Sequence, residues 1–263
     1  MEINKKAEDR VVSSVELFEE LSRIEPQKTF NSGFMNLDRM TKGFKEGDLV
    51  ILSGLTGAGK SQFAVALAKK YIEQGINPLF FSYEISSQEL FERFGQQVPV
   101  FYLPRINKSK SPQWIETKIE EAIKGFGTKV VFIDHLHYLV DEYTTRSKNT
   151  SEMLGQMCRD FKQIARRLRV VIVLLCHVRK FTTTRPNMQD VKDSSGIIQE
   201  ADAVLIIHRT GKKRSRKSAN QEEEFETDNK ATLYLDKIRR MGGKIGKIDY
   251  VFENGDFLED TWQ

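Results

Sequence analysis

The sequence lacks the features that mark secreted and membrane proteins. Among its 263 residues there are two cysteines, Cys158 and Cys176, which form no C-x-x-C pair and predict no disulfide framework. No apolar run approaches the roughly 18–20 residues that cross a bilayer. Residues 1–10 are charged and lack the apolar segment of a secretory signal. We therefore expect a soluble protein of the cytoplasm.

The sequence also lacks a large excess of charge of one sign. Lys and Arg number 41 against 37 Asp and Glu, and the formal net charge of +4 excludes a histone-like tail protein. Local basic patches are compatible with this balance and matter more for anion binding than the total charge. With 39% hydrophobic residues the chain can bury a core. Its length predicts a single large domain or one domain with a short arm. We place the arm at residues 1–29 and the domain at residues 30–263.

After residue 48, short apolar runs without polar alternation recur along the chain, as is typical of strands buried on both faces of a parallel sheet. The runs are LVILS (49–53), PLFFSY (78–83), KVVFID (129–134), VVIVLLC (170–176) and AVLII (203–207). Helical patterns separate them at 61–74, 112–123 (with Ser111 as N-cap) and 153–168. The alternation predicts an α/β fold with a mostly parallel twisted sheet.

The two ends of the chain have different patterns. Residues 11–24 predict a short amphipathic helix, because apolar residues recur at helical steps and Ser13 and Glu16 have capping-box spacing. Residues 30–48 are expected to be loop-rich. Near the C-terminus, ATLYLDKIRR (231–240) and GKIDYVFE (246–253) alternate as strands do, and Met241-Gly242-Gly243 joins them as an antiparallel hairpin.

The segment GLTGAGKS (54–61) fits the G-x-x-x-x-G-K-[ST] motif, and it directly follows an apolar run and opens a helix. Such a loop turns backbone N–H groups around phosphates, with Lys60 as a point charge at the β/γ end and the Ser61 hydroxyl on Mg²⁺. A simple glycine turn before a helix would explain the glycines but not this context. We assign nucleotide binding to Gly54, Thr56, Gly57, Ala58, Gly59, Lys60, Ser61 and Gln62.

Two carboxylates follow apolar runs and are expected at the same edge of the sheet. Asp134 ends KVVFID, where it could hold Mg²⁺ through a water, although a strand-ending Asp can also cap the next turn. Glu84, in FFSYEIS, could orient or deprotonate a water, which spacing alone supports weakly. ATP or another NTP, together with Mg²⁺, is the cofactor set that these residues predict.

Six motifs occur in an order that resembles one family. They are SGFMNLDRMTKGFKEGDLVILSGLTGAGKS, FFSYEIS, VVFIDHLHYL, LLCHVRK, SSGIIQEADAVLII and LDKIRRMGGKIGKI. Together they cover about residues 30–258 and resemble the RecA-like motor domain of the hexameric replicative helicases: bacterial DnaB, the phage primase–helicases and the mitochondrial helicase Twinkle. The resemblance implies a RecA-like P-loop NTPase core, a short N-terminal linker helix, and a cytoplasmic site of action at the nucleoid or in a phage-infected cell.

The resemblance also implies roles for individual residues. Glu84 matches the catalytic Glu that polarises the attacking water, and Asp134 matches the Walker B Asp. His177 matches a residue that senses the γ-phosphate and couples it to a DNA-binding loop. Lys237 and Arg239 match a K-x-R pair whose Arg enters the neighbouring subunit's site. Separately, Arg209 matches a position that stacks on the base, and the 11–24 helix matches the linker helix that docks on the adjacent subunit.

The position of Arg239 in the sequence agrees with an arginine supplied in trans. It follows the P-loop by more than a hundred residues and is expected on a late, edge-type strand. An arginine finger can raise the rate ~10³–10⁵-fold. Without the family resemblance, an exposed basic edge strand is the interpretation of KIRR that the sequence favours.

Basic residues after the fourth apolar run are candidates for binding single-stranded DNA. Arg179, Lys180, Arg185 and Lys192 lie among small hydroxyl residues that could bind phosphates without reading bases; the alternative is a solvated polar loop. The cluster KKRSRK (212–217) is followed by an acidic run, and a disordered insertion explains it as well as DNA binding does. His135-x-His137 could indicate metal, but we expect a loop role, because the sequence shows no Cys or carboxylate cluster to complete a zinc site.

These observations predict a ring-forming, ATP-driven helicase motor that is a homo-oligomer, hexameric by the resemblance, and that has no membrane partner. Only about 30 residues precede the motor region, so we expect either a minimal helicase or an excised domain. One alternative is a RecA-class ATPase that binds DNA or a regulatory partner without unwinding. Another is a P-loop kinase of a small molecule, against which the sequence shows no Arg-rich lid.

Overall fold

The fold is taken from a computed structural model of the chain. It describes residues 10–95, 97–142, 150–177, 186–191, 194–209 and 229–260, and for residues 140–142, 150, 194 and 195 it describes the backbone alone. Four residues predicted to bind DNA lie outside the described residues: Arg179, Lys180, Arg185 and Lys192. The basic cluster at 212–217 lies outside them too, so all of these assignments stay predictions.

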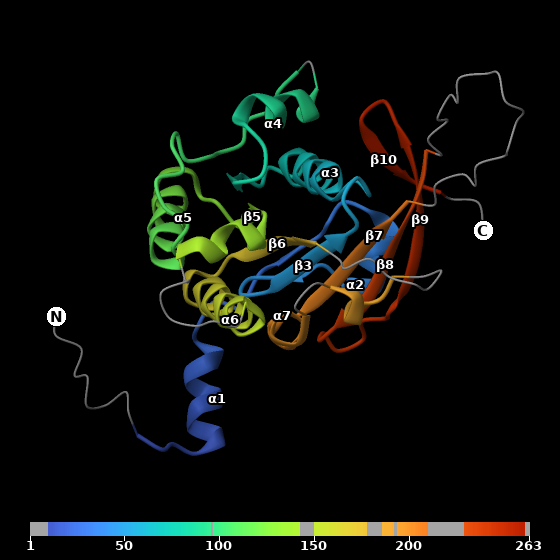
Figure 1. The fold of residues 1–263 in the computed structure, drawn as a ribbon. Helices are drawn as coiled ribbons and strands as arrows, with labels where there is room; N and C mark the ends of the chain where they lie inside the picture. Colours follow the sequence, from blue (N-terminus) through green and yellow to red (C-terminus); the bar gives the residue numbers. More distant parts are fainter. Residues whose placement is uncertain are drawn as a thin grey trace, which may run out of the picture.

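A sheet of eight strands forms the centre of the molecule, in the order β10-β9-β8-β7-β3-β6-β5-β4 (Figure 1). Its strands are β3 (Leu49–Gly54), β4 (Pro78–Ser82), β5 (Val130–Asp134), β6 (Val171–His177), β7 (Ala203–His208), β8 (Lys230–Ile238), β9 (Gly246–Glu253) and β10 (Asp256–Glu259). The five strands from β7 to β4 pair in parallel, and β8, β9 and β10 extend the sheet antiparallel. The predicted α/β fold, parallel strands and C-terminal hairpin are confirmed.

Helices cover both faces of the sheet, which is why the central strands are buried along their whole length and mostly apolar (Figure 1). One face packs against α2 (Met35–Thr41), α3 (Lys60–Glu73) and α4 (Ser87–Phe94). The other face packs against α5 (Pro112–Phe126), α6 (Thr150–Leu168) and α7 (Ser194–Glu200). Neighbouring strand residues point to opposite faces, so Phe132 belongs to the first core and Ile133 to the second.

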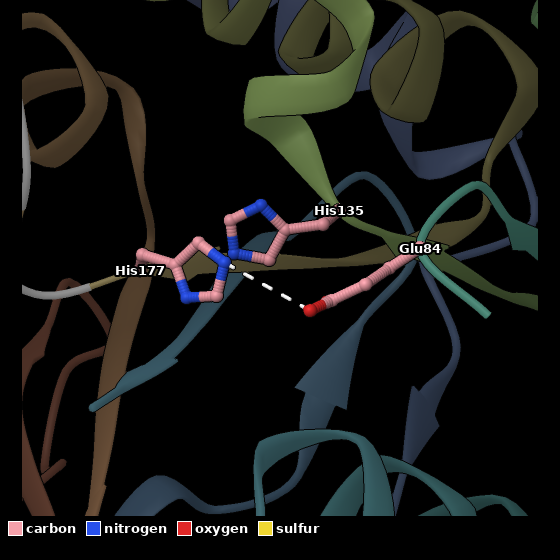
Figure 2. Close-up of side chains that lie close together, drawn as sticks. All are labelled: Glu84, His135 and His177. Carbon is pink, nitrogen blue, oxygen red and sulfur yellow. Dashed lines mark ion pairs between the residues drawn. The ribbon is translucent and has the colours of Figure 1, made fainter. Parts of the chain in front are cut away.

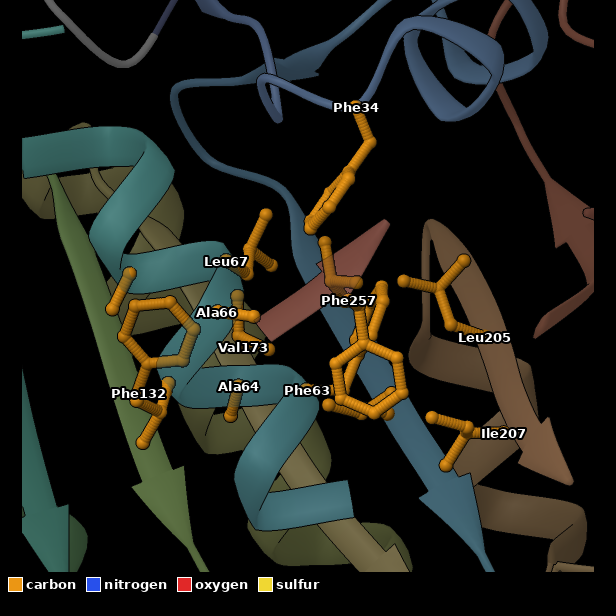
Figure 3. Packing of buried hydrophobic residues seen from close by; sticks show 14 of the residues in the cluster. Phe34, Phe63, Ala64, Ala66, Leu67, Phe132, Val173, Leu205, Ile207 and Phe257 are labelled. Carbon is orange, nitrogen blue, oxygen red and sulfur yellow. The ribbon is translucent and has the colours of Figure 1, made fainter. Parts of the chain in front are cut away.

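An aromatic cluster fixes α3, the helix that follows the glycine-rich loop. The Phe63 ring lies 5.4 Å from the Phe34 ring and 5.2 Å from the Phe257 ring, measured between centroids (Figure 3). Phe34 precedes α2 and Phe257 lies on β10. The first turn of α3 is therefore held by segments from both ends of the chain, which gives the loop before it a rigid base.

Three described α-helices, α2, α4 and α7, were not predicted from the sequence. Residues 30–48 were expected to be loop-rich, but α2 and two short strands, β1 (Thr29–Phe30) and β2 (Phe44–Lys45), lie within or beside them. That expectation is wrong in part, because seven residues are enough for a helix when Leu37 is buried in the core. Helix α4 had a readable signal: Ser86 and Glu89 form a capping box, in which each side chain bonds the other residue's backbone N–H.

The predicted edge position of the strand before Arg239 is wrong. Strand β8 lies inside the sheet, between β7 and β9, and the outermost strands are β10 and β4. Strand β10 was not predicted, and it continues the antiparallel meander beyond the hairpin. Arg239 and Arg240, which follow β8, therefore do not protect an outer strand of the sheet from pairing.

The N-terminal helix α1 (Ser14–Ser22) lies within the predicted 11–24 segment and extends away from the rest of the chain (Figure 1). The Ser13 hydroxyl caps it by accepting a hydrogen bond of 3.1 Å from the backbone N–H of Glu16. Its apolar residues are exposed, Phe18 to 72%. The division into an arm at 1–29 and a domain at 30–263 stays a prediction. Among the described helices, none has the length and apolar character needed to span a membrane.

Candidate active site

The glycine-rich loop connects β3 to α3 at the carboxyl edge of the parallel strands. Gly57 and Gly59 have φ angles of +79° and +94°, which residues other than glycine rarely adopt. Gly54 is needed for a different reason: a Cβ there would lie 2.5 Å from the carbonyl oxygen of Ile207 on β7. The loop therefore turns tightly and lies close to the neighbouring strand, which leaves its backbone amides at the N-terminus of α3.

Lys60 opens α3 and is only 5% exposed. Its ammonium group donates to the carbonyl oxygens of Gly54 and Leu55, both at 3.1 Å. Burial lowers the pKa of Lys60, and the nearby carboxylates of Glu84 and Asp134 act in the opposite direction. The charge that the motif requires is thus inside the loop, beside the two acidic residues that were predicted to share the site.

Asp134 ends β5 and is almost fully buried. Burial raises the pKa of this carboxyl group to about 6, and a hydrogen bond from the Ser61 side chain opposes the shift. Its Oδ1 atom is buried and has no hydrogen-bond partner among the residues described. A buried carboxylate oxygen that lacks a partner, next to a serine hydroxyl, is a suitable pair of ligands for a hard divalent cation such as Mg²⁺.

Three side chains from separate strand ends meet next to this position (Figure 2). The Nε2 atom of His177, at the end of β6, lies 4.0 Å from Oε1 of Glu84, in the segment after β4. His135 follows β5, is fully buried, and its ring lies 3.7 Å from the His177 ring between centroids. Burial, with the positive charge that His177 and His137 would carry, lowers the pKa of His135 to about 2, so this imidazole is neutral.

The strand register explains why residues so distant in sequence meet here. Gly54 on β3 pairs with His177 on β6, and Ser82 on β4 pairs with Asp134 on β5. The carboxyl ends of parallel strands reach one edge of the sheet, where ligands bind in open α/β folds. The loop, both acidic residues and His177 therefore lie at one edge, as predicted from the sequence, and the arrangement suits the binding and hydrolysis of a nucleoside triphosphate.

Residues 29–110 and 102–257 match the family described as "DnaB-like helicase C terminal domain". The chain belongs to this family. Among curated relatives, the probable replicative DNA helicase of Trieres chinensis is 28% identical over 92% of this chain and 61% of its own length. The replicative DNA helicase DnaB of Mycoplasma genitalium is 26% identical over 85% of this chain and 54% of its own length. The chain thus spans little more than half the length of these relatives.

Solved structures support the fold of this DnaB-like domain. A DnaB-like replicative helicase, solved in a study of its interactions with primase, has a TM-score of 0.70 at 21% identity, over 97% of this chain and 69% of its own. A second similar structure, an ATPase domain, also has a TM-score of 0.70, at 22% identity, over 93% of this chain and 96% of its own. The RecA-like architecture predicted from the motifs is confirmed.

Lys237 and Arg239 of the DnaB-like domain lie towards the opposite end of the strands from the loop. Ile238, which precedes Arg239, pairs with Ala203 at the start of β7. Gly54, where the loop begins, pairs with Ile207 near the end of the same strand. At ~3.3 Å per residue, this separation along the strands is roughly 13 Å. Arg239 therefore cannot complete its own subunit's site without a large rearrangement of β8, as expected from the sequence.

Both basic side chains instead contact the C-terminal end of α7. Arg239 donates to the carbonyl oxygen of Gln199, Lys237 donates to that of Ile198, and an Arg239 nitrogen lies 3.9 Å from Asp202. Burial lowers the pKa of Lys237. Cations at a helix C-terminus interact favourably with the unpaired carbonyl groups there. Within this chain the pair thus caps the helix that follows the predicted DNA-binding segment.

Other predicted nucleotide ligands lie around the loop. The guanidinium of Arg209 lies 5.4 Å above the Phe252 ring, a cation–π contact that places a flat group near the site. The Gln62 amide donates to the carbonyl oxygens of Gly255 at 2.7 Å and Arg93 at 3.3 Å, so it links α3 to α4 and to the β9–β10 turn. Thr56 is exposed in the loop, and the Ala58 N–H donates to the carbonyl oxygen of Leu55 within it.

Two features of the site were missed or misread in the sequence. The H-x-H pattern did not reveal that Glu84 and His177 lie beside His135, because they come from other strands and the sheet register joins them. The loop role expected for His135-x-His137 stays a prediction. Arg93, on α4, carries a positive charge close enough to act on Asp134. Its signal was the capping box that begins α4 directly after Glu84.

Proposed function

We propose that this chain is the motor domain of a replicative DNA helicase that forms a ring, hexameric as its family implies, and hydrolyses ATP at the boundaries between subunits. One observation carries the proposal: Lys60, Asp134 and Glu84 lie at one edge of the sheet and Arg239 at the other. A hydrolytic site that needs all four is completed only when two subunits meet. Membership in a family of replicative helicases supports this arrangement.

In each subunit the loop between β3 and α3 binds the phosphates. Backbone N–H groups at the start of α3 and the Lys60 ammonium supply positive charge to the β- and γ-phosphates. The Ser61 hydroxyl and the Asp134 carboxylate would hold Mg²⁺, which neutralises phosphate charge. Arg209 lies beside Phe252, where a stacked purine base would meet its guanidinium plane.

Glu84 prepares the attacking water. Its carboxylate is close enough to Lys60 and Asp134 to act on their charges, and it accepts a proton from a water aligned with the γ-phosphate. Arg239 from the adjacent subunit stabilises the charge that spreads over the transferred phosphoryl group, a contribution of ~10³–10⁵ in rate. Lys237 accompanies it on the same strand end.

His177 connects this chemistry to DNA. It lies 4.0 Å from Glu84 and ends β6, so a change at the γ-phosphate reaches the segment that follows it in the chain. That segment carries Arg179, Lys180, Arg185 and Lys192, which bind the phosphates of single-stranded DNA irrespective of sequence. Binding of this kind weakens steeply as the salt concentration rises.

Helix α1 is proposed to dock on the adjacent subunit as a linker. Its apolar side chains, Val15, Phe18 and Leu21, are more than half exposed within one chain, which is costly unless another surface covers them. Phe18→Asp should therefore lower the mass of the assembly in sedimentation experiments, whereas Glu19→Ala, on the polar side, should leave it unchanged. An unchanged mass for Phe18→Asp would contradict docking through this face.

The proposed function is tested by ATP hydrolysis and by strand separation. ATPase activity should rise several-fold when single-stranded DNA is added, and a forked duplex should be unwound; Lys60→Ala should show neither effect. Stimulation by DNA without unwinding would favour the non-unwinding RecA-class ATPase. A rate of ATP hydrolysis that does not change when DNA is added would contradict both the helicase and the non-unwinding DNA-binding ATPase.

A further inference from the structure

Glu84, His135 and His177 form a cluster of candidate metal ligands that differs from the Ser61–Asp134 pair. One ligand atom from each residue lies within 4.8 Å of the other two (Figure 2). The three side chains come from the ends of β4, β5 and β6, so the rigid sheet holds their backbones at fixed separations. Two imidazoles and one carboxylate at this spacing are a chemically distinct site.

The buried member of the cluster has an unused ligand atom. His135 is fully buried, and its Nδ1 accepts a long hydrogen bond of 3.4 Å from the backbone N–H of His137. Its Nε2 is buried with no hydrogen-bond partner in the described part of the chain. Because Nδ1 is an acceptor, the neutral ring carries its proton on Nε2, where it faces the backbone of Cys176. Leaving a buried polar atom unpaired is unfavourable, and a cation at Nε2 would remove that penalty. Binding there requires the other tautomer, in which the proton has moved to Nδ1 and the long hydrogen bond from His137 is given up.

The donor set selects the class of cation. Two histidine nitrogens and a glutamate oxygen form one of the ligand sets of zinc, with bond lengths of about 2.0–2.2 Å. Magnesium prefers oxygen ligands in an octahedral arrangement, so it is better suited to Ser61 and Asp134. Nitrogen ligands therefore make the cluster selective for a borderline transition cation over the cation that accompanies ATP.

We propose that Glu84, His135 and His177 bind Zn²⁺ or a similar divalent transition cation, and that the bound cation stops ATP turnover. Binding requires a modest closure: the His177 and Glu84 side chains, 23% and 26% exposed, approach the fixed His135. The His135 and His177 rings, which are tilted by 33° to each other with centroids 3.7 Å apart, rotate so that one nitrogen of each ring faces the ion. An open fourth position remains for water.

Inhibition follows from the shared residues, and this part of the inference rests on the proposed function. A carboxylate that is bound to a cation cannot accept a proton from water, so Glu84 is withdrawn from its role. His177 is held at the same time and cannot respond to the γ-phosphate. Because the phosphate loop does not belong to the cluster, excess Mg²⁺–ATP should not relieve the inhibition, whereas a chelator should.

The test measures binding of Co²⁺ and Zn²⁺ to the full chain, freed of metal and without nucleotide. Tetrahedral Co²⁺ absorbs visible light, and we expect one equivalent per chain, displaced by Zn²⁺. Glu84→Gln, His135→Ala and His177→Ala should each weaken binding ~10-fold or more. His208→Ala, at the end of β7 and outside the cluster, is the matched control and should bind as wild type does.

The partly exposed residues keep the test decisive if His135→Ala does not fold, because Glu84→Gln and His177→Ala remove surface-accessible ligands. The inference is contradicted if the wild type takes up no Co²⁺ equivalent, or if these variants bind as tightly as the wild type. A protein that binds one equivalent but never hydrolyses ATP would contradict the proposed function and support the metal site. Hydrolysis that continues with Zn²⁺ bound would contradict the inhibition.

Discussion

At the scale of single residues, the two carboxylates of the site have different surroundings. Asp134 is buried at the end of β5 and has an oxygen without a partner among the described residues, whereas the Glu84 side chain is 26% exposed beside His177. A carboxylate reachable by water can accept its proton, and a buried one can hold a cation. The structure therefore supports separate roles for two residues of similar chemistry.

Replacing Glu84 by Gln tests its role as the group that activates water. The amide keeps the size of the side chain but cannot accept a proton, so turnover should fall by ~10²–10⁴-fold. ATP affinity should remain within a few-fold of wild type, because Lys60 and the loop bind the phosphates. Single-turnover hydrolysis and nucleotide titration measure the two quantities. Wild-type turnover would remove Glu84 from this role.

Asp134 should destabilise the protein when no cation is bound. Its pKa is raised from 3.8 to about 6, so the fold favours the protonated form, and at pH 7 the ionised carboxylate costs roughly 3 kcal/mol. This cost is absent below the unfolded-state pKa, grows as the pH rises from there to the folded-state pKa, and is complete above it. Asp134→Asn should therefore unfold at higher urea concentration than wild type at a pH of about 7.5, while losing ATPase activity.

The pH series provides the control for Asp134→Asn. The stability difference between variant and wild type, both free of metal and nucleotide, should shrink as the pH is lowered from about 7.5 towards about 4.5. A difference that stays constant over this range would show that the carboxylate's charge is not its cause. Adding Mg²⁺ and ATP should stabilise the wild type more than the variant, because the variant lacks the carboxylate proposed to hold Mg²⁺.

At the scale of secondary-structure elements, the sequence predicted best where burial is complete. Strands β3 to β7 are apolar on both faces, so their runs stand out, and α5 was marked by its Ser111 cap and Pro112. Short elements were harder: α2 and β10 depend on contacts with distant segments, which Phe34, Phe63 and Phe257 illustrate. The approach of His135 to His177 was not predictable, because only the register of β3, β5 and β6 brings them together.

Helix α4 offers a test of local stabilisation next to the site. The Ser86 hydroxyl accepts a hydrogen bond of 3.2 Å from the Glu89 N–H at the start of the helix. Ser86→Ala removes this cap and should lower the free energy of unfolding by about 1 kcal/mol, measured in urea. Ser87→Ala is the matched control, because Ser87 is the first helical residue rather than the cap, and it should change little.

At the scale of the whole molecule, the two edges of one sheet carry the two parts of the proposed site. Lys60 and Glu84 belong to the carboxyl edge of the parallel strands, and Arg239 to the other edge, where it contacts α7. A ring that repeats one boundary brings the second edge of each subunit to the first edge of the next. The motif order indicated this from the sequence, but the distance between the edges is known only from the structure.

Mixing two inactive variants measures whether the site is shared. Lys60→Ala fails to bind the phosphates and Arg239→Ala fails to supply the finger, so each alone should lose nearly all ATPase activity in the presence of single-stranded DNA. In a mixture, an Arg239→Ala subunit placed next to a Lys60→Ala subunit has one intact site, and activity should return at those boundaries. A mixture of Lys60→Ala with Glu84→Gln has a defect in every site and should stay inactive. Restored hydrolysis in the first mixture alone is the result predicted here, and no restoration at any mixing ratio would contradict a site formed between subunits.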